Sequence, residues 1–231
     1  LDEWRVAKRD MTAAGYNTLF ADWAVRDVED AVRRDRNHPS IFMWSVGNEV
    51  RENGTAEGAA DARRLVEAVH RLDPSRPVTS GTSFMAVANR SGFANAFDVA
   101  GYNDGGGGVF LYSEDRLKFP GRMFIGTEHP HTGHTRGVYH TTTRMREKVP
   151  GHPPVPNLAP QEVFPETQEV VPDRPVVRSS YDNDSVYLNS RDSWRLTASL
   201  PYLMGEFRWT GIDYLGESRW PARATPSGLL D

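Results

Sequence analysis

Two glutamates, Glu49 and Glu128, each follow an apolar run that predicts a buried strand. The first run is 41–46 and the second is 122–127. A carboxyl group where a buried strand opens into a loop is partly withdrawn from water, so it can hold a proton and donate it to a leaving group. Two such groups on nearby strand ends, roughly 5 Å apart, could approach a glycosidic bond from both sides, as retaining glycoside hydrolysis requires.

The elements that must position these glutamates alternate along the chain, which predicts a parallel sheet covered by helices. We expect helices over 22–35, 55–72 and 189–204, and strands over 41–46, 78–80, 97–102, 122–127 and 206–215. Carboxylates at the carboxyl ends of parallel strands are typical of a TIM (β/α)8 barrel, whose active sites occupy that face. Only five strands are predicted. The expected fold class is therefore α/β, a TIM barrel present in part, from about strand four to strand eight.

Composition limits the classes of function. The 231 residues are 38% hydrophobic and 25% charged, which suits a folded globular protein rather than a disordered one. A net charge of −4 gives no electrostatic basis for binding nucleic acid, and no apolar run approaches the roughly 20 residues of a membrane helix. Cysteine is absent, so no disulfide framework or thiolate metal site is expected. Periplasmic, secreted and cytoplasmic locations all stay open.

The run DRNHPSIFMWSVGNE at 35–49 closely resembles the strand-four signature of family 2 glycoside hydrolases, the group of β-galactosidases, β-glucuronidases and relatives. The segment PYLMGEFRWTGIDYLGE at 201–217 resembles one β-galactosidase-like branch of that family. The resemblance implies that residues 1–231 form part of the catalytic barrel. It also implies that the family's jelly-roll and immunoglobulin-like domains, and the first three barrel strands, are absent from this chain.

The segment 129–178 departs most from the family and is where substrate choice is expected to be set. Eight prolines fall within 150–175, and proline at this density blocks helix and interior strand. We therefore expect a long proline-rich loop inserted between a strand and its helix. Such loops are often functional, and a surface insertion without a role is the alternative.

The resemblance assigns roles to the two carboxyl groups. The Asn-Glu pair on strand four implies that Glu49 is the acid/base and that Asn48 donates its amide to a sugar hydroxyl beside the cleaved bond. Gly126-Thr127-Glu128 is similar to the end of strand seven in one bacterial branch, which implies that Glu128 is the nucleophile. The alternative for either glutamate is a salt-bridge partner.

Two other glutamates compete for these roles. Glu206 is expected to open the last strand, which would put it at the wrong face of the barrel and make it structural. Glu217 is expected to end that strand and could contact substrate.

Further substrate-binding residues are implied by the same family. Tyr102 and Asn103 end the strand between the two carboxyl groups, and a family tyrosine near this position implies a hydrogen bond from Tyr102 to Glu128. Trp209 lies in the last predicted strand, where the family places a tryptophan platform under the sugar ring. A core tyrosine and a core tryptophan are the respective alternatives.

Four histidines follow the second glutamate within 129–140. We expect a polar loop that lines the substrate, in which His129 or His131 could bind hydroxyls. Metal binding is the less favoured interpretation, because the spacing is not a common zinc pattern. We therefore expect no metal site and no required cofactor, although some relatives bind Mg²⁺ or Na⁺.

These observations predict a retaining exo-β-glycosidase that hydrolyses terminal β-D-galactosides, with a carbohydrate as its partner. No Asn-x-Lys pair occurs, which disfavours the β-glucuronidase branch, and β-mannosides stay open. The alternative from another class is a non-catalytic carbohydrate-binding remnant that keeps the tryptophan platform without turnover. Neither the oligomeric state nor the activity of the chain alone follows from the sequence.

Overall fold

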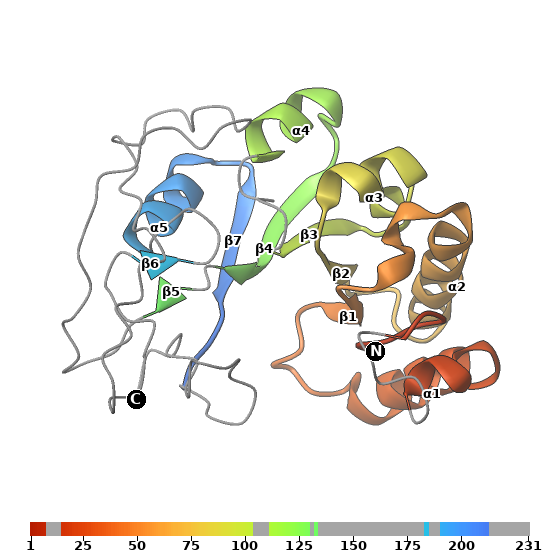
Figure 1. The fold of residues 1–231 in the computed structure, drawn as a ribbon. Helices are drawn as coiled ribbons and strands as arrows, with labels where there is room; N and C mark the ends of the chain where they lie inside the picture. Colours follow the sequence, from red (N-terminus) through yellow and green to blue (C-terminus); the bar gives the residue numbers. More distant parts are fainter. Residues whose placement is uncertain (8–14, 104–110, 130–131, 134–182, 185–189, 213–231) are drawn as a thin grey trace, which may run out of the picture. The chain divides into compact units, whose positions relative to one another are not determined.

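The computed structural model describes only part of the chain (Figure 1), namely residues 1–7, 15–103, 111–129, 132–133, 183–184 and 190–212. The chain forms two compact units. The first comprises Leu1–Thr127 and Tyr202–Met204, and the second comprises Glu128–Pro201 and Gly205–Asp231. The proline-rich segment expected from the sequence lies outside the described residues.

A five-stranded sheet with the order β1-β2-β3-β4-β7 is the centre of the described fold. Its strands are β1 (Trp44–Asn48), β2 (Val78–Thr82), β3 (Val99–Asn103), β4 (Met123–His129) and β7 (Leu203–Arg208). The pairs β1–β2 and β2–β3 are parallel. A short antiparallel pair, β5 (Thr132–Gly133) and β6 (Asn183–Asp184), forms a second sheet.

A helix separates each pair of consecutive strands in the larger sheet, as α/β folds require. The helices are α1 (Phe20–Asp35), α2 (Ala56–Leu72), α3 (Met85–Ser91), α4 (Tyr112–Lys118) and α5 (Ser190–Ser199), with 3₁₀ turns η1 (Tyr16–Thr18), η2 (Arg51–Gly54) and η3 (Ala94–Ala96). In the first unit α1 packs against α2, and α2 packs against β1 (Figure 1). The α/β alternation and the five sheet strands expected from the sequence are confirmed.

Helix α1 forms because its apolar residues recur every fourth position. Phe20, Ala24, Val28 and Val32 are all buried, which gives the helix one continuous inner face. Helix α2 begins where Thr55, its N-cap residue, accepts a hydrogen bond from the Gly58 amide at 2.9 Å.

The first strand is shorter than its apolar run predicts. It begins at Trp44, because the ladder with β2 starts only at the pair of Trp44 and Val78. Before that point the Ile41 carbonyl accepts a hydrogen bond from the Arg76 side chain at 2.7 Å. Phe42 is consequently 55% exposed rather than buried.

The last strand also differs from its prediction. It spans Leu203–Arg208 rather than 206–215, and α5 ends at Ser199, close to Pro201, because proline disfavours helix in the residue before it. Glu206 therefore lies inside the strand and does not open it.

The register of β1 against β2 contains a bulge. Ser45 pairs with Thr79 and Asn48 pairs with Gly81, so three steps along β1 match two steps along β2. A bulge adds one residue to one strand and re-aims the side chains beyond it. It stands directly before Asn48 and Glu49.

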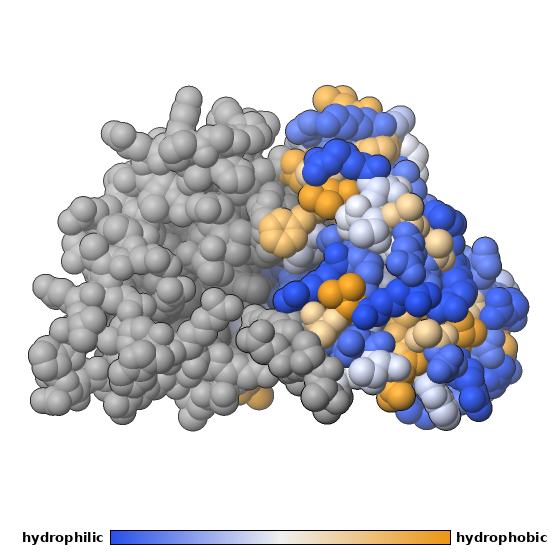
Figure 2. Space-filling model, turned by 45° about the vertical axis from the view of Figure 1, so that its right-hand side comes forward, coloured by the Kyte–Doolittle hydropathy of each residue, from blue (hydrophilic) through white to orange (hydrophobic). Residues whose placement is uncertain are grey.

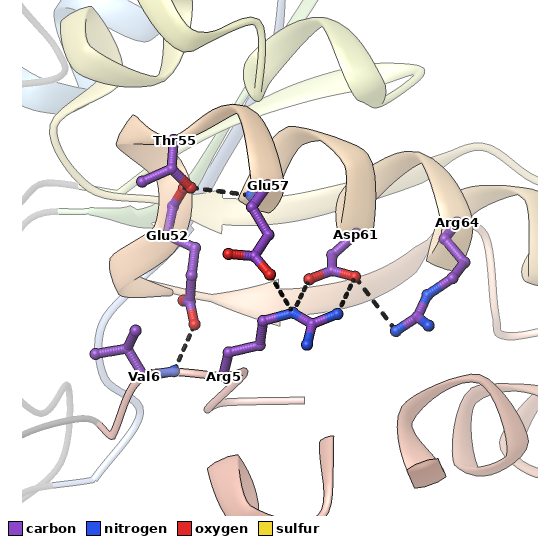
Figure 3. A network of polar contacts seen from close by, with 8 residues as sticks. Arg5, Val6, Glu52, Thr55, Glu57, Asp61 and Arg64 are labelled. Atoms are coloured by element: carbon purple, nitrogen blue, oxygen red, sulfur yellow. Dashed lines mark hydrogen bonds and ion pairs between the residues drawn. The ribbon is translucent and has the colours of Figure 1, made fainter. Parts of the chain in front are cut away.

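Residues 1–7 are fastened to the first unit by buried polar contacts (Figure 3). The Arg5 guanidinium donates two hydrogen bonds to the Asp61 carboxylate, at 2.5 and 3.1 Å, in a bidentate arrangement. Arg64 lies 3.3 Å from the same carboxylate. The Val6 amide donates to Glu52 at 2.5 Å. Because both acids are nearly fully buried, these bonds fix the start of the chain against α2 and η2.

Candidate active site

Glu49 directly follows β1 and is held from several sides. Its backbone lies in the left-handed region, with φ of 49°, and its amide donates to the Gly81 carbonyl at 2.7 Å. Its Oε1 accepts a hydrogen bond from the Ser83 hydroxyl at 2.5 Å and lies 3.3 Å from the donating Asn103 Nδ2. Glu49 is partly exposed as a residue, and both of these side-chain contacts are made to its Oε1.

A chain of polar side chains runs beside this carboxylate across the strand ends. The Thr127 hydroxyl donates to Asn103 Oδ1 at 2.6 Å, and Asn103 Nδ2 donates to Asn48 Oδ1 at 3.0 Å. Asn48 Nδ2 then donates to Asp2 Oδ1 at 3.0 Å. The Asp2 carboxylate can only accept, so it fixes which way the Asn48 amide points and, through Asn48 Oδ1, which way the Asn103 amide points.

Gly81 makes the close approach of these amides sterically feasible. A Cβ atom at this position would lie 2.6 Å from Asn48 Oδ1 and 2.7 Å from Asn103 Oδ1, nearer than non-bonded atoms can sit. Only glycine leaves room for both amides above β2.

The structure brings three of the sequence-predicted residues together: Asn48, Glu49 and Asn103. Sequence reasoning missed Asp2, Ser83 and Thr127. Ser83 directly follows β2, so a longer predicted strand would have placed it at the same strand-end level as Asn48. Asp2 carries no such signal, because its contact with Asn48 joins segments 46 residues apart.

The predicted hydrogen bond from Tyr102 to Glu128 is corrected. The Tyr102 hydroxyl donates to Asp115 at 2.8 Å, and the side chain is fully buried against the rings of Tyr112 and Phe124. Burial raises the pKa of Tyr102, and the Asp115 carboxylate raises it further. Successive strand residues point to opposite faces, so Asn103 reaches the site while Tyr102 packs on the other side.

In the second unit, Glu128 is the penultimate residue of β4 and is partly exposed. His129 is fully buried, so its expected place in an accessible substrate-lining loop is corrected. The physical reason is that His129 still belongs to the strand, where its carbonyl accepts a hydrogen bond from the Trp209 amide at 3.0 Å.

Trp209 follows β7 and is partly exposed, and its role as a sugar platform stays a prediction. Glu206 Oε2 accepts a hydrogen bond from the Thr197 hydroxyl of α5 at 2.7 Å, which supports the structural interpretation of this glutamate. His131 and Glu217 lie outside the described residues.

The described ranges contain neither a metal-binding cluster nor a membrane-spanning helix. No group of three histidine, aspartate or glutamate side chains there could hold a metal ion. Among the helices that the structure describes, none combines the length and the apolar character needed to cross a membrane.

A parallel sheet with helices between its strands, and a carboxylate held among amides where those strands end, together define part of an α/β barrel with its polar site on the usual face. A model of the family described as glycosyl hydrolases family 2, TIM barrel domain, matches residues 5–148. The chain therefore belongs to glycosyl hydrolase family 2 and forms part of its TIM barrel domain.

Individual relatives agree with this family. A protein of Formosa agariphila provisionally named a β-glucuronidase is 37% identical over 206 residues, which cover 86% of this chain and 18% of the relative. A β-galactosidase of Bacteroides ovatus is 30% identical over 100% of this chain and 29% of its own length. The crystal structure of a β-glycosidase from Bacteroides vulgatus matches with a TM-score of 0.72 at 40% identity, over 100% of this chain and 28% of the other.

The chain spans less than a third of the length of either of these two curated relatives.

Proposed function

We propose that this chain supplies both catalytic carboxyl groups of a retaining exo-β-glycosidase that cleaves terminal β-D-galactosides. The observation that carries the proposal is the position of Glu49. Its carboxylate stands at the carboxyl end of β1 in a glycoside hydrolase barrel, and Ser83 after β2 and Asn103 at the end of β3 both donate to its Oε1.

The proposed reaction has two steps. Glu49 in its acid form gives its proton to the departing glycosidic oxygen while Glu128 attacks the anomeric carbon and forms a glycosyl-enzyme. Glu49, now a carboxylate, takes a proton from water, and that water displaces Glu128 from the sugar.

The other assigned residues support this reaction in the proposal. Asn48 orients a sugar hydroxyl beside the cleaved bond, and Trp209 provides an apolar platform for the ring. The proposed steps use protein carboxyl groups, and binding of Mg²⁺ or Na⁺ stays a prediction.

A β-glucuronidase is the second candidate, because the Formosa agariphila relative carries that provisional name at 37% identity. No Asn-x-Lys pair occurs within residues 1–231, which disfavours the glucuronide and leaves β-mannosides open. A non-catalytic carbohydrate-binding protein is the candidate from another class, and it would bind sugars without releasing any aglycone.

The test is covalent trapping in the complete gene product. A 2-fluoro galactosyl inhibitor should leave a mass adduct on the peptide that contains Glu128. An adduct on Glu206 or Glu217 would contradict the assigned nucleophile. Turnover of aryl glucuronides without turnover of aryl galactosides would replace the proposed substrate, and no turnover of any aryl glycoside would favour the binding protein.

The acid/base assignment has its own variant. Glu49→Gln should lower kcat on aryl galactosides by about 100-fold or more, because general acid/base catalysis is worth that much. Glu114→Gln is the matched control, since Glu114 is half exposed on α4 and forms a surface ion pair with Lys118. Equal activity of Glu49→Gln and Glu114→Gln would remove Glu49 from the mechanism.

A further inference from the structure

Two non-glycine residues in the described part of the chain have a left-handed backbone, Glu49 with φ of 49° and Phe84 with φ of 54°. A bulky side chain rarely adopts this conformation, so such residues persist only where the surrounding structure holds them. Residues held in this way cluster at functional sites. The two outliers are linked through Ser83, which precedes Phe84 and donates to the Glu49 carboxylate.

The conformation of Phe84 is held from both sides. The preceding Ser83 carbonyl accepts a hydrogen bond from the buried Asn53 side chain at 2.6 Å. The Phe84 carbonyl accepts hydrogen bonds from the Val87 and Ala88 amides at 2.8 and 3.3 Å, which begin α3. The backbone is therefore fixed before and after the residue.

The ring of Phe84 does not explain this arrangement by packing, because the residue is 60% exposed. Apolar residues interrupt an otherwise mainly hydrophilic surface on the face shown in Figure 2. A single exposed apolar residue is ordinary, but one held in an unfavourable backbone conformation next to a catalytic candidate is not.

We propose that the Phe84 ring is a binding platform for the leaving group of the substrate, either a sugar ring or an aryl ring. This inference rests on the proposed function of Glu49. The acid delivers its proton to the departing oxygen, so the leaving group must lie against Glu49 when the bond breaks. Ser83 touches that carboxylate and is bonded directly to Phe84, so the exposed aromatic residue directly follows a residue that contacts the proposed acid.

The chemistry of such a platform is specific to rings. An aromatic face packs against another aromatic ring or against the apolar CH face of a pyranose, and it offers nothing to a leaving group that is a single atom. The ring should therefore matter for aryl galactosides and disaccharides and not for galactosyl fluoride.

The test compares Phe84→Asn with the wild type in the complete gene product. Asparagine tolerates the left-handed conformation, so the variant removes the ring without adding backbone strain. We expect kcat/KM to fall about tenfold for an aryl galactoside and for a galactose-terminated disaccharide, and to change less than twofold for galactosyl fluoride. Phe84→Tyr, which keeps an aromatic face, should stay within twofold of the wild type on all three substrates.

Phe42→Asn is the matched control, because Phe42 is similarly exposed and lies before β1, at the opposite end from Glu49. The Phe42→Asn variant should have the wild-type kcat/KM on all three substrates. Equal losses of Phe84→Asn on galactosyl fluoride and the aryl galactoside would overturn the platform, since the effect would then lie at the carboxylate. No loss on either substrate would overturn it as well.

Failure of the proposed function is distinguishable from failure of this inference. If the wild-type protein hydrolyses no glycoside, calorimetric titration of phenyl and methyl β-galactoside replaces the kinetic test. Phe84→Asn should then weaken binding of the phenyl glycoside about tenfold and leave the methyl glycoside unchanged. Equal affinities of the variant and the wild type for both ligands would reject the platform.

Discussion

The amides of Asn48 and Asn103 meet above a position that has no side chain, Gly81. Their contact selects which amide atom faces Glu49, because Asn103 donates to Asn48 and to the carboxylate with the same nitrogen. A methyl group at Gly81 would push the two amides apart. The orientation of the Glu49 carboxylate therefore depends on having glycine at position 81.

Gly81→Ala should lower kcat on aryl galactosides at least tenfold and reduce the free energy of unfolding by about 1–3 kcal/mol, because buried atoms must move. Gly121→Ala is the control, since a Cβ atom there meets nothing within 4 Å and should leave kcat and stability unchanged. Kinetics and urea denaturation of both variants measure the difference. Unaltered kcat in Gly81→Ala would contradict the amide network.

Thr127 anchors the other end of the same network through its hydroxyl. Thr127→Val keeps the shape but leaves Asn103 Oδ1 without this donor, which should cost about 1–2 kcal/mol of stability and allow the Asn103 amide to turn. We expect kcat to fall several-fold. Thr127→Ser retains the hydroxyl and should restore kcat, whereas a loss in Thr127→Ser equal to that in Thr127→Val would assign the effect to packing.

At the scale of elements, Asp73 joins the end of α2 to the start of β1. Its carboxylate accepts hydrogen bonds from Trp44 Nε1 at 3.0 Å, Ser75 Oγ at 2.6 Å and Arg76 Nη1 at 2.6 Å. Burial opposes ionisation of Asp73, but these hydrogen bonds outweigh burial and hold its pKa well below its usual range. The ionised Asp73 side chain thus connects the end of α2 to the start of β1, the strand that precedes Glu49.

A depressed pKa in the folded state stabilises the protein above the unfolded pKa of about 3.9 and ceases to do so as the pH falls toward the folded value. Asp73→Asn should therefore cost about 2 kcal/mol at pH 7, and the difference from the wild type should shrink below pH about 4. Asp30→Asn, an exposed change on α1, should cost little at either pH. Thermal unfolding at several pH values tests this, and a difference independent of pH would contradict it.

At the scale of the whole molecule, the larger sheet has five strands among the described residues, fewer than the eight that close a TIM barrel. Within those residues its two edge strands are β1 and β7. Edge strands present unpaired backbone groups that can pair with another chain. The first residues blunt one of these edges, because the Leu1 carbonyl accepts from the Asn48 amide and Trp4 Nε1 donates to the Val46 carbonyl.

We expect the 231-residue chain produced alone to self-associate, bind a hydrophobic dye and show no turnover, because the sheet has five of the eight strands of a closed barrel in the part of the chain that the structure describes. The complete gene product should neither self-associate nor bind the dye, and it should turn over an aryl glycoside. Light scattering and dye fluorescence of both proteins make the comparison. A monomeric, active short chain would contradict it.

Local patterns predicted most elements well, because apolar runs depend on neighbouring residues. The helix predicted over 55–72 is α2, Ala56–Leu72, and the strand predicted over 97–102 is β3, Val99–Asn103. The wrong predictions concern residues whose environment is set by contacts between segments far apart in the chain. Phe42 is exposed because β2 pairs only from Val78 onward, and Tyr102 faces the core because side chains alternate along a strand. Asp2 joins the site through contacts between segments far apart in the chain.

The bulge in β1 has a consequence for how this strand can change over generations. Side chains alternate along a strand, so gaining or losing one residue between Ser45 and Asn48 would turn Asn48 to the other face. Exchanges of one apolar residue for another leave that parity intact. Homologous sequences should therefore differ by amino-acid substitutions within β1 and not by insertions or deletions within it.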